Sequence, residues 1–154
     1  MPKQSAGILA YRKTGHILEV FLVHPGGPFW KNKDTGAWSI PKGEYEENEE
    51  PLHAAKREFT EETGQSIAGD FTVLTPVKYK GGKIIRAWAV AADIDHTNIK
   101  SNFFEMEWPP RSGKKASFEE VDRADWFDIE TAKRKIVPAQ VPLLDELAIC
   151  LNLV

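Results

Sequence analysis

Residues 38–67 read WSIPKGEYEENEEPLHAAKREFTEETGQSI, and the second half of this stretch predicts one helix. Asn48 is a capping residue type, and Pro51 is tolerated only in a first turn, where backbone N–H groups lack helical partners. Gly64 predicts the end of the helix, because glycine readily adopts the left-handed conformation that closes many helices. Apolar residues recur at helical spacing and form one stripe: Leu52, Ala55 and Phe59.

Three acids of the same helix, Glu58, Glu61 and Glu62, fall together on another face. Like charges at this spacing repel by about 0.2–0.5 kcal/mol per pair. Glu61 and Glu62 also stand in the last turn, where the helix dipole favours cations. A hard divalent cation would relieve both penalties, because Mg²⁺ prefers carboxylate oxygens and bridges to phosphates. The other interpretation is a solvated acidic face, which needs no ligand.

The spacing around these acids is more specific than the acids alone. Gly43 is followed after five residues by Glu49, and after seven more by the run REFTEETG, which begins at Arg57. This pattern resembles the signature of the Nudix hydrolases, G-x5-E-x7-R-E-U-x-E-E-x-G-U, where U is a bulky apolar residue. The one departure is Gln65 at the last position, and we expect Ile67 to pack there instead.

The resemblance implies a metal site on the helix. Its expected ligands are the carboxylates of Glu58, Glu61 and Glu62, with Gly43 in a tight turn whose carbonyl can face the metal. The expected cofactor is Mg²⁺, with Mn²⁺ as a substitute.

Further residues are expected to support catalysis. Arg57 lies four residues before Glu61 on the helix, so it can orient that carboxylate, and Glu49 can hold Arg57 by a charge-assisted hydrogen bond. Residues 118–128, FEEVDRADWFD, resemble the late Nudix segment in which a glutamate faces the metal site, and Glu120 is the first candidate, with Glu119 second. Acids that merely precede a helix are the alternative. The general base is Glu61 or Glu120.

Substrate contacts are expected outside the signature. Residues 25–37, PGGPFWKNKDTGA, form a long loop, and exposed aromatic residues beside lysines suit a site that stacks a base and holds phosphate. The candidates are Phe29, Trp30, Lys31, Lys42 and Tyr79. The alternatives are loop aromatics that cap the edge of the core, and a structural tyrosine.

Composition limits the class of protein. The 154 residues suit one domain, 1–154, and the 42% hydrophobic and 28% charged content is ordinary for a globular protein. A net charge of −3 argues against a nucleic-acid polymer as partner. The single cysteine, Cys150, excludes an internal disulfide and is expected in the core. No apolar run is long enough to span a membrane, so we expect a cytoplasmic protein, a monomer or homodimer, that binds a small nucleotide.

The remaining pattern predicts strands at 5–11, 19–24, 71–78 and 83–92, an irregular crossover over 93–115 that holds a short strand, and helices at 129–135 and 141–151. This order fits a layered α/β (α+β) domain. The resemblance implies an α/β/α sandwich with a mixed β-sheet.

The resemblance also implies Mg²⁺-dependent hydrolysis of a phosphoanhydride bond in a substrate linked to a nucleoside diphosphate. The expected substrate is diadenosine tetraphosphate, cleaved asymmetrically to ATP and AMP. The alternative is a nucleoside triphosphate pyrophosphohydrolase, for example one that removes 8-oxo-dGTP. A non-catalytic nucleotide-binding module is the third reading.

Overall fold

The computed structural model describes residues 3–151, so the first two and last three residues of the expected domain lie outside the described part. Its strands and helices follow one another along the chain as β1 (Gln4–Thr14), β2 (Ile17–Pro25), β3 (Lys42–Glu44), α1 (Pro51–Thr63), β4 (Thr72–Val73), β5 (Val77–Lys78), β6 (Ile84–Ala91), β7 (Phe103–Glu107), β8 (Lys115–Glu119), β9 (Val121–Asp128), α2 (Ile129–Lys135), a 3-10 turn (Pro138–Gln140) and α3 (Val141–Cys150).

The described residues form a seven-stranded sheet with the central order β4-β6-β1-β2-β9. β1 and β6 run parallel, whereas β2 pairs antiparallel with both β1 and β9. The short strand β3 pairs with β1, and β5 pairs with β6. The expected mixed sheet is therefore confirmed.

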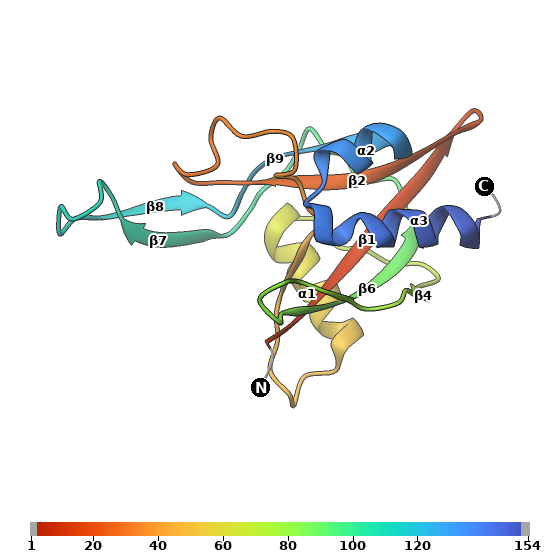
Figure 1. The fold of residues 1–154 in the computed structure, drawn as a ribbon, viewed down its shortest axis with the longest axis horizontal. Helices are drawn as coiled ribbons and strands as arrows, with labels where there is room; N and C mark the ends of the chain where they lie inside the picture. The colour runs from red at the N-terminus through yellow and green to blue at the C-terminus, as the bar shows by residue number, and fades with distance from the viewer. Residues whose placement is uncertain (1–2, 152–154) are drawn as a thin grey trace.

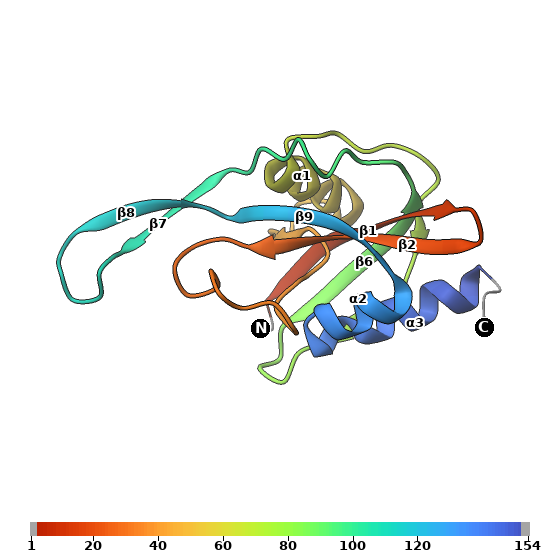
Figure 2. The same ribbon diagram turned by 90° about the horizontal axis from the view of Figure 1, so that it is seen from above.

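Helices cover both faces of this sheet (Figures 1 and 2). Alternate residues of β1 and β2 point to opposite faces. Ile8 and Phe21 pack in the core under α1, whereas Leu9 and Leu22 pack in the core under α2 and α3. Because both faces are covered, β1 and β2 are nearly continuous apolar runs rather than alternating ones. The expected α/β/α layering is confirmed.

Two expected features of the strands are modified. The strand expected at 71–78 is broken into β4 and β5, because Pro76 has no N–H to continue the ladder and the N–H of Thr75 donates instead to Glu146 in α3. The strand expected inside 93–115 is present as β7, and it pairs with β8 in a separate two-stranded ribbon.

Two expectations about single residues were wrong. The cap of α1 is Glu50, not Asn48, because the Glu50 carboxylate accepts the N–H of His53 at 2.8 Å and thereby satisfies an N-terminal donor. Cys150 is exposed rather than in the core. It stands in the last turn of α3, where Ile149 is also exposed, so nothing in the described chain covers this turn. Gly64 does end α1 in the left-handed conformation, with φ +75°.

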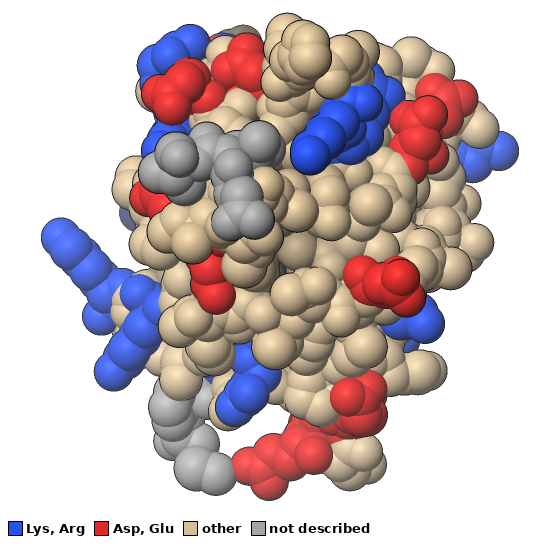
Figure 3. All heavy atoms as spheres, turned by 90° about the vertical axis from the view of Figure 1, so that its right-hand side faces the viewer, with Lys and Arg blue, Asp and Glu red and all other residues tan. Residues whose placement is uncertain are grey.

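Charge is mixed on the face that carries the turn between β1 and β2. Figure 3 shows Lys and Arg interspersed there with Asp and Glu, without a patch of one sign. Within residues 3–151, every helix is too short or too polar to span a bilayer.

Candidate active site

The approach of β3 to α1 builds the floor of the site. Gly43 lies within β3, paired with Ala6 of β1, so it is in a strand and not in the expected tight turn. A Cβ atom at this position would lie 2.1 Å from the Glu58 carboxylate, so any other residue would displace that carboxylate. Glycine therefore allows the β3 backbone to rest directly on a glutamate that is only 8% exposed.

Arg57 gathers three carboxylates around one guanidinium group. Its Nε and Nη2 donate to Glu49 at 2.8 and 3.0 Å, which is a bidentate pair. Its Nη1 donates to Glu58 at 2.9 Å and to Glu61 at 3.1 Å. The hydrogen bonds that Arg57 donates to Glu49 raise the pKa of Arg57, and the guanidinium holds the pKa of Glu49 below its usual range. The arginine thus keeps two α1 carboxylates together that would otherwise repel.

A small cavity of about 250 Å³ opens beside α1, and Lys42 and Glu62 both line it. The backbone N–H of Lys42 donates to Glu62 at 3.3 Å. Burial raises the pKa of Glu62 to about 8, and it lowers the pKa of Lys42. Burial is therefore the main reason that Glu62 binds its proton more tightly than an exposed glutamate, although Lys42 acts in the opposite direction.

Backbone hydrogen bonds bring Glu120 to the same cavity from a distant part of the chain. The N–H of Asn102 donates to the carbonyl of Glu61 at 2.8 Å, and the N–H of Glu120 donates to the carbonyl of Asn102 at 3.0 Å. Glu120 lines the cavity with Glu62. Burial and the charge of Glu61 raise the pKa of Glu120. Sequence resemblance named this residue, but only these contacts place it opposite α1.

The loop over residues 26–37 contributes unequally to the cavity. Trp30 lines it and is 39% exposed, and the Lys33 ammonium lies 5.3 Å from the centre of the Trp30 ring. Phe29, 59% exposed, packs edge-on against Trp108 at 5.7 Å, outside the set of cavity-lining residues. Lys31 is exposed and does not line the cavity.

Tyr79 is not brought to the cavity. It packs against the core on the α2 and α3 side of the sheet, and its hydroxyl accepts a hydrogen bond from Gln140 Nε2 at 2.8 Å. Burial raises the pKa of its hydroxyl. The same Gln140 side chain also donates to Ser39 Oγ at 2.9 Å and accepts the Ile40 N–H at 3.1 Å. Gln140 therefore links Tyr79 to the backbone that leads to Lys42.

Sequence reasoning missed two fully buried polar residues that support the site. Gln140, just described, holds the segment before β3. His24, at the end of β2, has Asp122 Oδ1 2.8 Å from Nδ1 and the Lys33 carbonyl 2.6 Å from Nε2. His24 thereby ties the Trp30 loop to the sheet. Neither residue belongs to a motif. The only sign of a structural role in the sequence was position: His24 ends an apolar strand, and Gln140 directly precedes a helix.

The residues around the cavity fit a hard divalent cation in their donor chemistry. Carboxylate oxygens of Glu58, Glu61, Glu62 and Glu120 are the ligand type that Mg²⁺ prefers. Glu58 and Glu61 accept from Arg57 in this structure. In the described part of the chain, no three acidic, histidine or cysteine side chains are spaced as a preformed metal cage.

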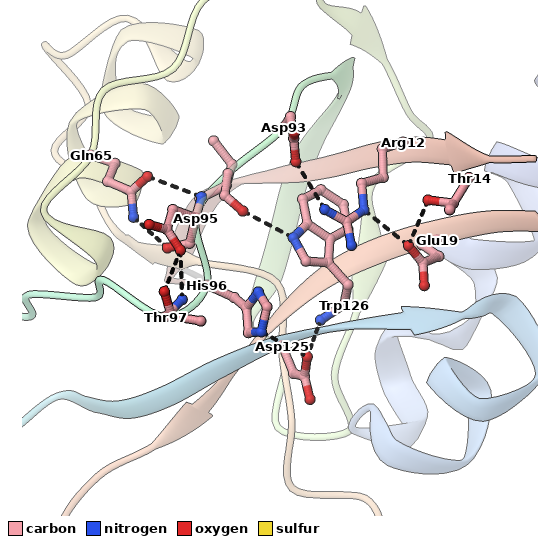
Figure 4. A network of polar contacts seen from close by, with 11 residues as sticks. Arg12, Thr14, Glu19, Gln65, Asp93, Asp95, His96, Thr97, Asp125 and Trp126 are labelled. Atoms are coloured by element: carbon pink, nitrogen blue, oxygen red, sulfur yellow. Dashed lines mark hydrogen bonds and ion pairs between the residues drawn. The ribbon is translucent and has the colours of Figure 1, made fainter.

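The departure from the signature, Gln65, has a role of its own (Figure 4). Its side chain donates to the carbonyls of Asp95 and Asn98 at 2.8 and 3.2 Å and accepts the Asp95 N–H at 3.3 Å. Ile67, two residues later, is buried in the core under α1, as expected. An amide at position 65 therefore fastens the loop after β6 to the end of α1.

Comparison with known proteins places this geometry in a family. The model of the NUDIX domain matches residues 1–147. The RNA pyrophosphohydrolase of Bartonella henselae is 30% identical over 152 residues, which cover 84% of this chain and 78% of that protein.

Two solved structures share the fold. The C. elegans Ap4A hydrolase, in a binary complex, has a TM-score of 0.67 and 21% identity, with 97% of this chain and 98% of that chain covered. The NUDIX domain of Shewanella oneidensis NrtR, complexed with ADP ribose, has a TM-score of 0.68 and 14% identity, with coverage of 98% and 89%. The chain therefore belongs to the NUDIX family, as a Nudix hydrolase that acts on acid anhydrides in phosphorus-containing substrates.

Proposed function

We propose that the cavity beside α1 hydrolyses a phosphoanhydride bond in a substrate linked to a nucleoside diphosphate, with diadenosine tetraphosphate, cleaved to ATP and AMP, as the first choice. One observation carries the proposal. Two carboxylates, those of Glu62 and Glu120, line a cavity that also holds Lys42 and Trp30, and the carboxylates of Glu58 and Glu61 lie near enough to interact electrostatically with Glu120. We extend the proposal to residues 1–154 as one NUDIX domain.

Nudix enzymes generally use divalent cations, and we propose Mg²⁺, with Mn²⁺ as a substitute. The carbonyl of Gly43 and the carboxylates of Glu58, Glu61 and Glu62 would hold it. When bound, the cation would neutralise phosphate charge and lower the pKa of water.

The protein's own groups have separable roles. Glu120 or Glu61 accepts the proton of the attacking water, and both border the same backbone junction at Asn102. Lys42 presents a point charge to a phosphate oxygen from the cavity wall. Arg57, held by Glu49, keeps the α1 carboxylates in position, because ligand geometry depends on such partners.

Trp30 supports a nucleotide substrate. Its ring is exposed at the cavity with a lysine ammonium nearby, an arrangement that suits a stacked base and a phosphate. Pyrophosphohydrolysis of a nucleoside triphosphate, such as 8-oxo-dGTP, is the second candidate. The similarity to an RNA pyrophosphohydrolase favours this reaction class and adds a triphosphorylated RNA end to the substrates to be tested.

A substrate screen with Mg²⁺, with products separated by chromatography, tests the proposal. The panel holds diadenosine tetraphosphate, dGTP, 8-oxo-dGTP, ADP-ribose, a nucleotide sugar and a 5′-triphosphorylated RNA. We expect ATP plus AMP from diadenosine tetraphosphate and little release from the others. Pyrophosphate and a monophosphate from the triphosphates would move the protein to the second candidate. Absence of Mg²⁺-dependent turnover of every substrate would leave a binding module.

A further inference from the structure

The ribbon of β7 and β8 starts directly at the candidate active site. Its first strand follows Asn102 and its second strand ends before Glu120, and the N–H of Glu120 donates to the carbonyl of Asn102 at 3.0 Å. The N–H of Asn102 in turn donates to Glu61 of α1. Figures 1 and 2 show the ribbon as an arm that extends away from the sheet. The arm is thus attached to the molecule at the catalytic carboxylates.

The two faces of the ribbon differ in chemistry. One face carries Glu105, Glu107 and Glu119 with Phe103, which is 63% exposed. The other face carries the cross-strand pairs Phe104 with Phe118 and Met106 with Ala116. We call these four residues the inner face. Among the described elements, β7 and β8 pack chiefly on each other. An isolated two-stranded hairpin is marginal in water, so an apolar face without a covering helix or sheet needs an explanation.

The inner face is continuous with the cavity and with the Trp30 loop. Phe104 lines the same cavity as Glu62, Lys42 and Trp30. A Cβ atom at Gly27 would lie 3.0 Å from the Phe104 ring, and Gly27 has φ +95°, so glycine permits this close approach of loop and ribbon. Farther out, Trp108 packs edge-on against Phe29. Aromatic rings therefore extend from the carboxylates along the arm.

We propose that the inner face, with Phe104 as its principal contact, is a second nucleoside-binding site that stacks the base at the far end of a polyphosphate chain. The proposal rests on the proposed function, since it requires a substrate with a nucleoside on each side of the phosphates. Stacking on an aromatic ring tolerates any base and is worth about 1–3 kcal/mol per base. Trp30 borders the cavity, whereas the inner face begins at the cavity with Phe104 and continues beyond it with Phe118 and Met106, so two bases joined by phosphates would each have an aromatic surface of their own.

A pair of ligands that differ by one nucleoside tests this site. Diadenosine tetraphosphate and adenosine 5′-tetraphosphate carry the same number of phosphates, but only the first has a second adenosine. Their dissociation constants are measured by calorimetry with Mg²⁺ in a Glu61→Gln background, which suppresses turnover. Three further substitutions are added one at a time: Phe104→Leu, which keeps apolar volume but removes the ring, Phe104→Tyr, which keeps the ring, and Phe103→Leu, the matched control on the outer face.

We expect Phe104→Leu to weaken the binding of diadenosine tetraphosphate about tenfold, which is the effect of losing one stacked base. The dissociation constant of adenosine 5′-tetraphosphate should change by less than about twofold. Phe104→Tyr and Phe103→Leu should change neither constant by more than about twofold. Three results would overturn the site. Phe104→Leu and Phe103→Leu could change the dissociation constants equally, or Phe104→Leu could weaken both ligands equally. The Glu61→Gln protein could also bind the two ligands with equal affinity. Tighter binding of a triphosphorylated RNA dinucleotide than of diadenosine tetraphosphate would overturn the assigned occupant.

The two proposals fail separately. If the unsubstituted protein hydrolyses diadenosine tetraphosphate but Phe104→Leu does not discriminate between the ligands, the ribbon site is wrong and the function stands. If the unsubstituted protein does not hydrolyse it, but binding depends on the ring at position 104, the ribbon site stands and the assigned reaction is wrong.

Discussion

The two walls of the candidate cavity are built in opposite ways. The α1 wall is charged and comes from consecutive turns of one helix, in which Arg57 binds Glu58 and Glu61 while Glu62 lines the cavity. The opposite wall carries the rings of Trp30 and Phe104 together with Glu120. These residues come from separate segments, and the Trp30 loop is held by a few polar contacts such as that of His24 with the Lys33 carbonyl.

In the proposed function, the carboxylates of the α1 wall serve catalysis and the aromatic rings select the substrate. Carboxylates that must meet one cation need a rigid support, and a helix supplies it through its regular spacing. Rings that contact a base tolerate more movement and can be carried by loops and hairpins on the same scaffold. The two walls should therefore respond differently to substitution.

The largest effect is expected on the α1 wall from Glu62→Gln. The amide keeps the shape and can still accept the Lys42 N–H, but it cannot ionise to bind a cation. We expect kcat to fall by at least about 100-fold, which is about 2.7 kcal/mol of barrier, with the fold intact by circular dichroism. Activity within about threefold, or under about 0.7 kcal/mol, would show that this wall does not hold the catalytic metal.

Arg57→Ala should have the next largest effect. Loss of the guanidinium releases Glu49, Glu58 and Glu61 together, and supporting groups of this kind are worth about 10- to 100-fold in activity. Steady-state kcat/KM checks this expectation. Arg57→Lys is the control, because it keeps the charge but not the fork, and it should recover only part of the loss. Full recovery by lysine would mean that charge alone is required.

On the aromatic wall, His24→Leu should reduce stability rather than the chemical step. It leaves Asp122 and the Lys33 carbonyl without their partner, at a cost of about 1–3 kcal/mol. Urea unfolding measures this loss, which corresponds to roughly 2–4 °C in Tm per kcal/mol. Asp122→Asn keeps an acceptor oxygen and should cost less. If the two variants lose the same stability, the contact with Lys33 does not anchor the loop.

A smaller effect is expected where α1 meets the loop after β6. Gln65→Ala removes hydrogen bonds to Asp95 and Asn98 that are exposed to solvent, so we expect a loss of about 0.5–1.5 kcal/mol in the free energy of unfolding and unchanged kcat. Ser66→Ala is the neighbouring control and should be neutral. Gln65→Leu restores the apolar residue of the signature, and a stability above that of the natural protein would show that packing matters more here than the loop contacts.

The smallest effect is expected at Asp34, within the Trp30 loop, and it depends on pH. Hydrogen bonds first from Lys135 and then from Trp38 hold the pKa of Asp34 below its usual range. A lowered pKa in the folded state stabilises the protein above the unfolded pKa of about 3.9, and this stabilisation is lost as the pH falls through the lower folded value.

Asp34→Asn should therefore cost less than about 1 kcal/mol at pH 7, because the pair with Lys135 is exposed. Unfolding by urea at decreasing pH measures the difference between the two proteins, which should shrink below about pH 4. A difference that stays constant down to pH 3 would assign the effect to the hydrogen-bond geometry rather than to charge.

The local sequence was sufficient to predict helix α1 and the arrangement of the charged residues on it. Turn spacing along one helix puts Glu58 and Glu61 within reach of Arg57, and no other part of the chain is needed for that. The left-handed end at Gly64 and the apolar runs of β1 and β2 are local in the same sense. The predicted cap was wrong because Glu50, which is not a preferred capping type, stands directly before the helix and accepts the His53 N–H, whereas Asn48 lies two residues earlier.

The tertiary structure decided everything that depends on long-range pairing. Glu120 reaches α1 only because the backbone of Asn102 lies between them, and Tyr79 is held away from the cavity by Gln140. Phe104 belongs to the cavity only because glycine at position 27 lets the loop approach β7. Sequence by itself determined the helix, the spacing of its carboxylates and the family, since local geometry follows from neighbouring residues. The cavity's opposite wall was decided by strand pairing and loop anchoring, because contacts between segments far apart leave no periodic pattern along the chain.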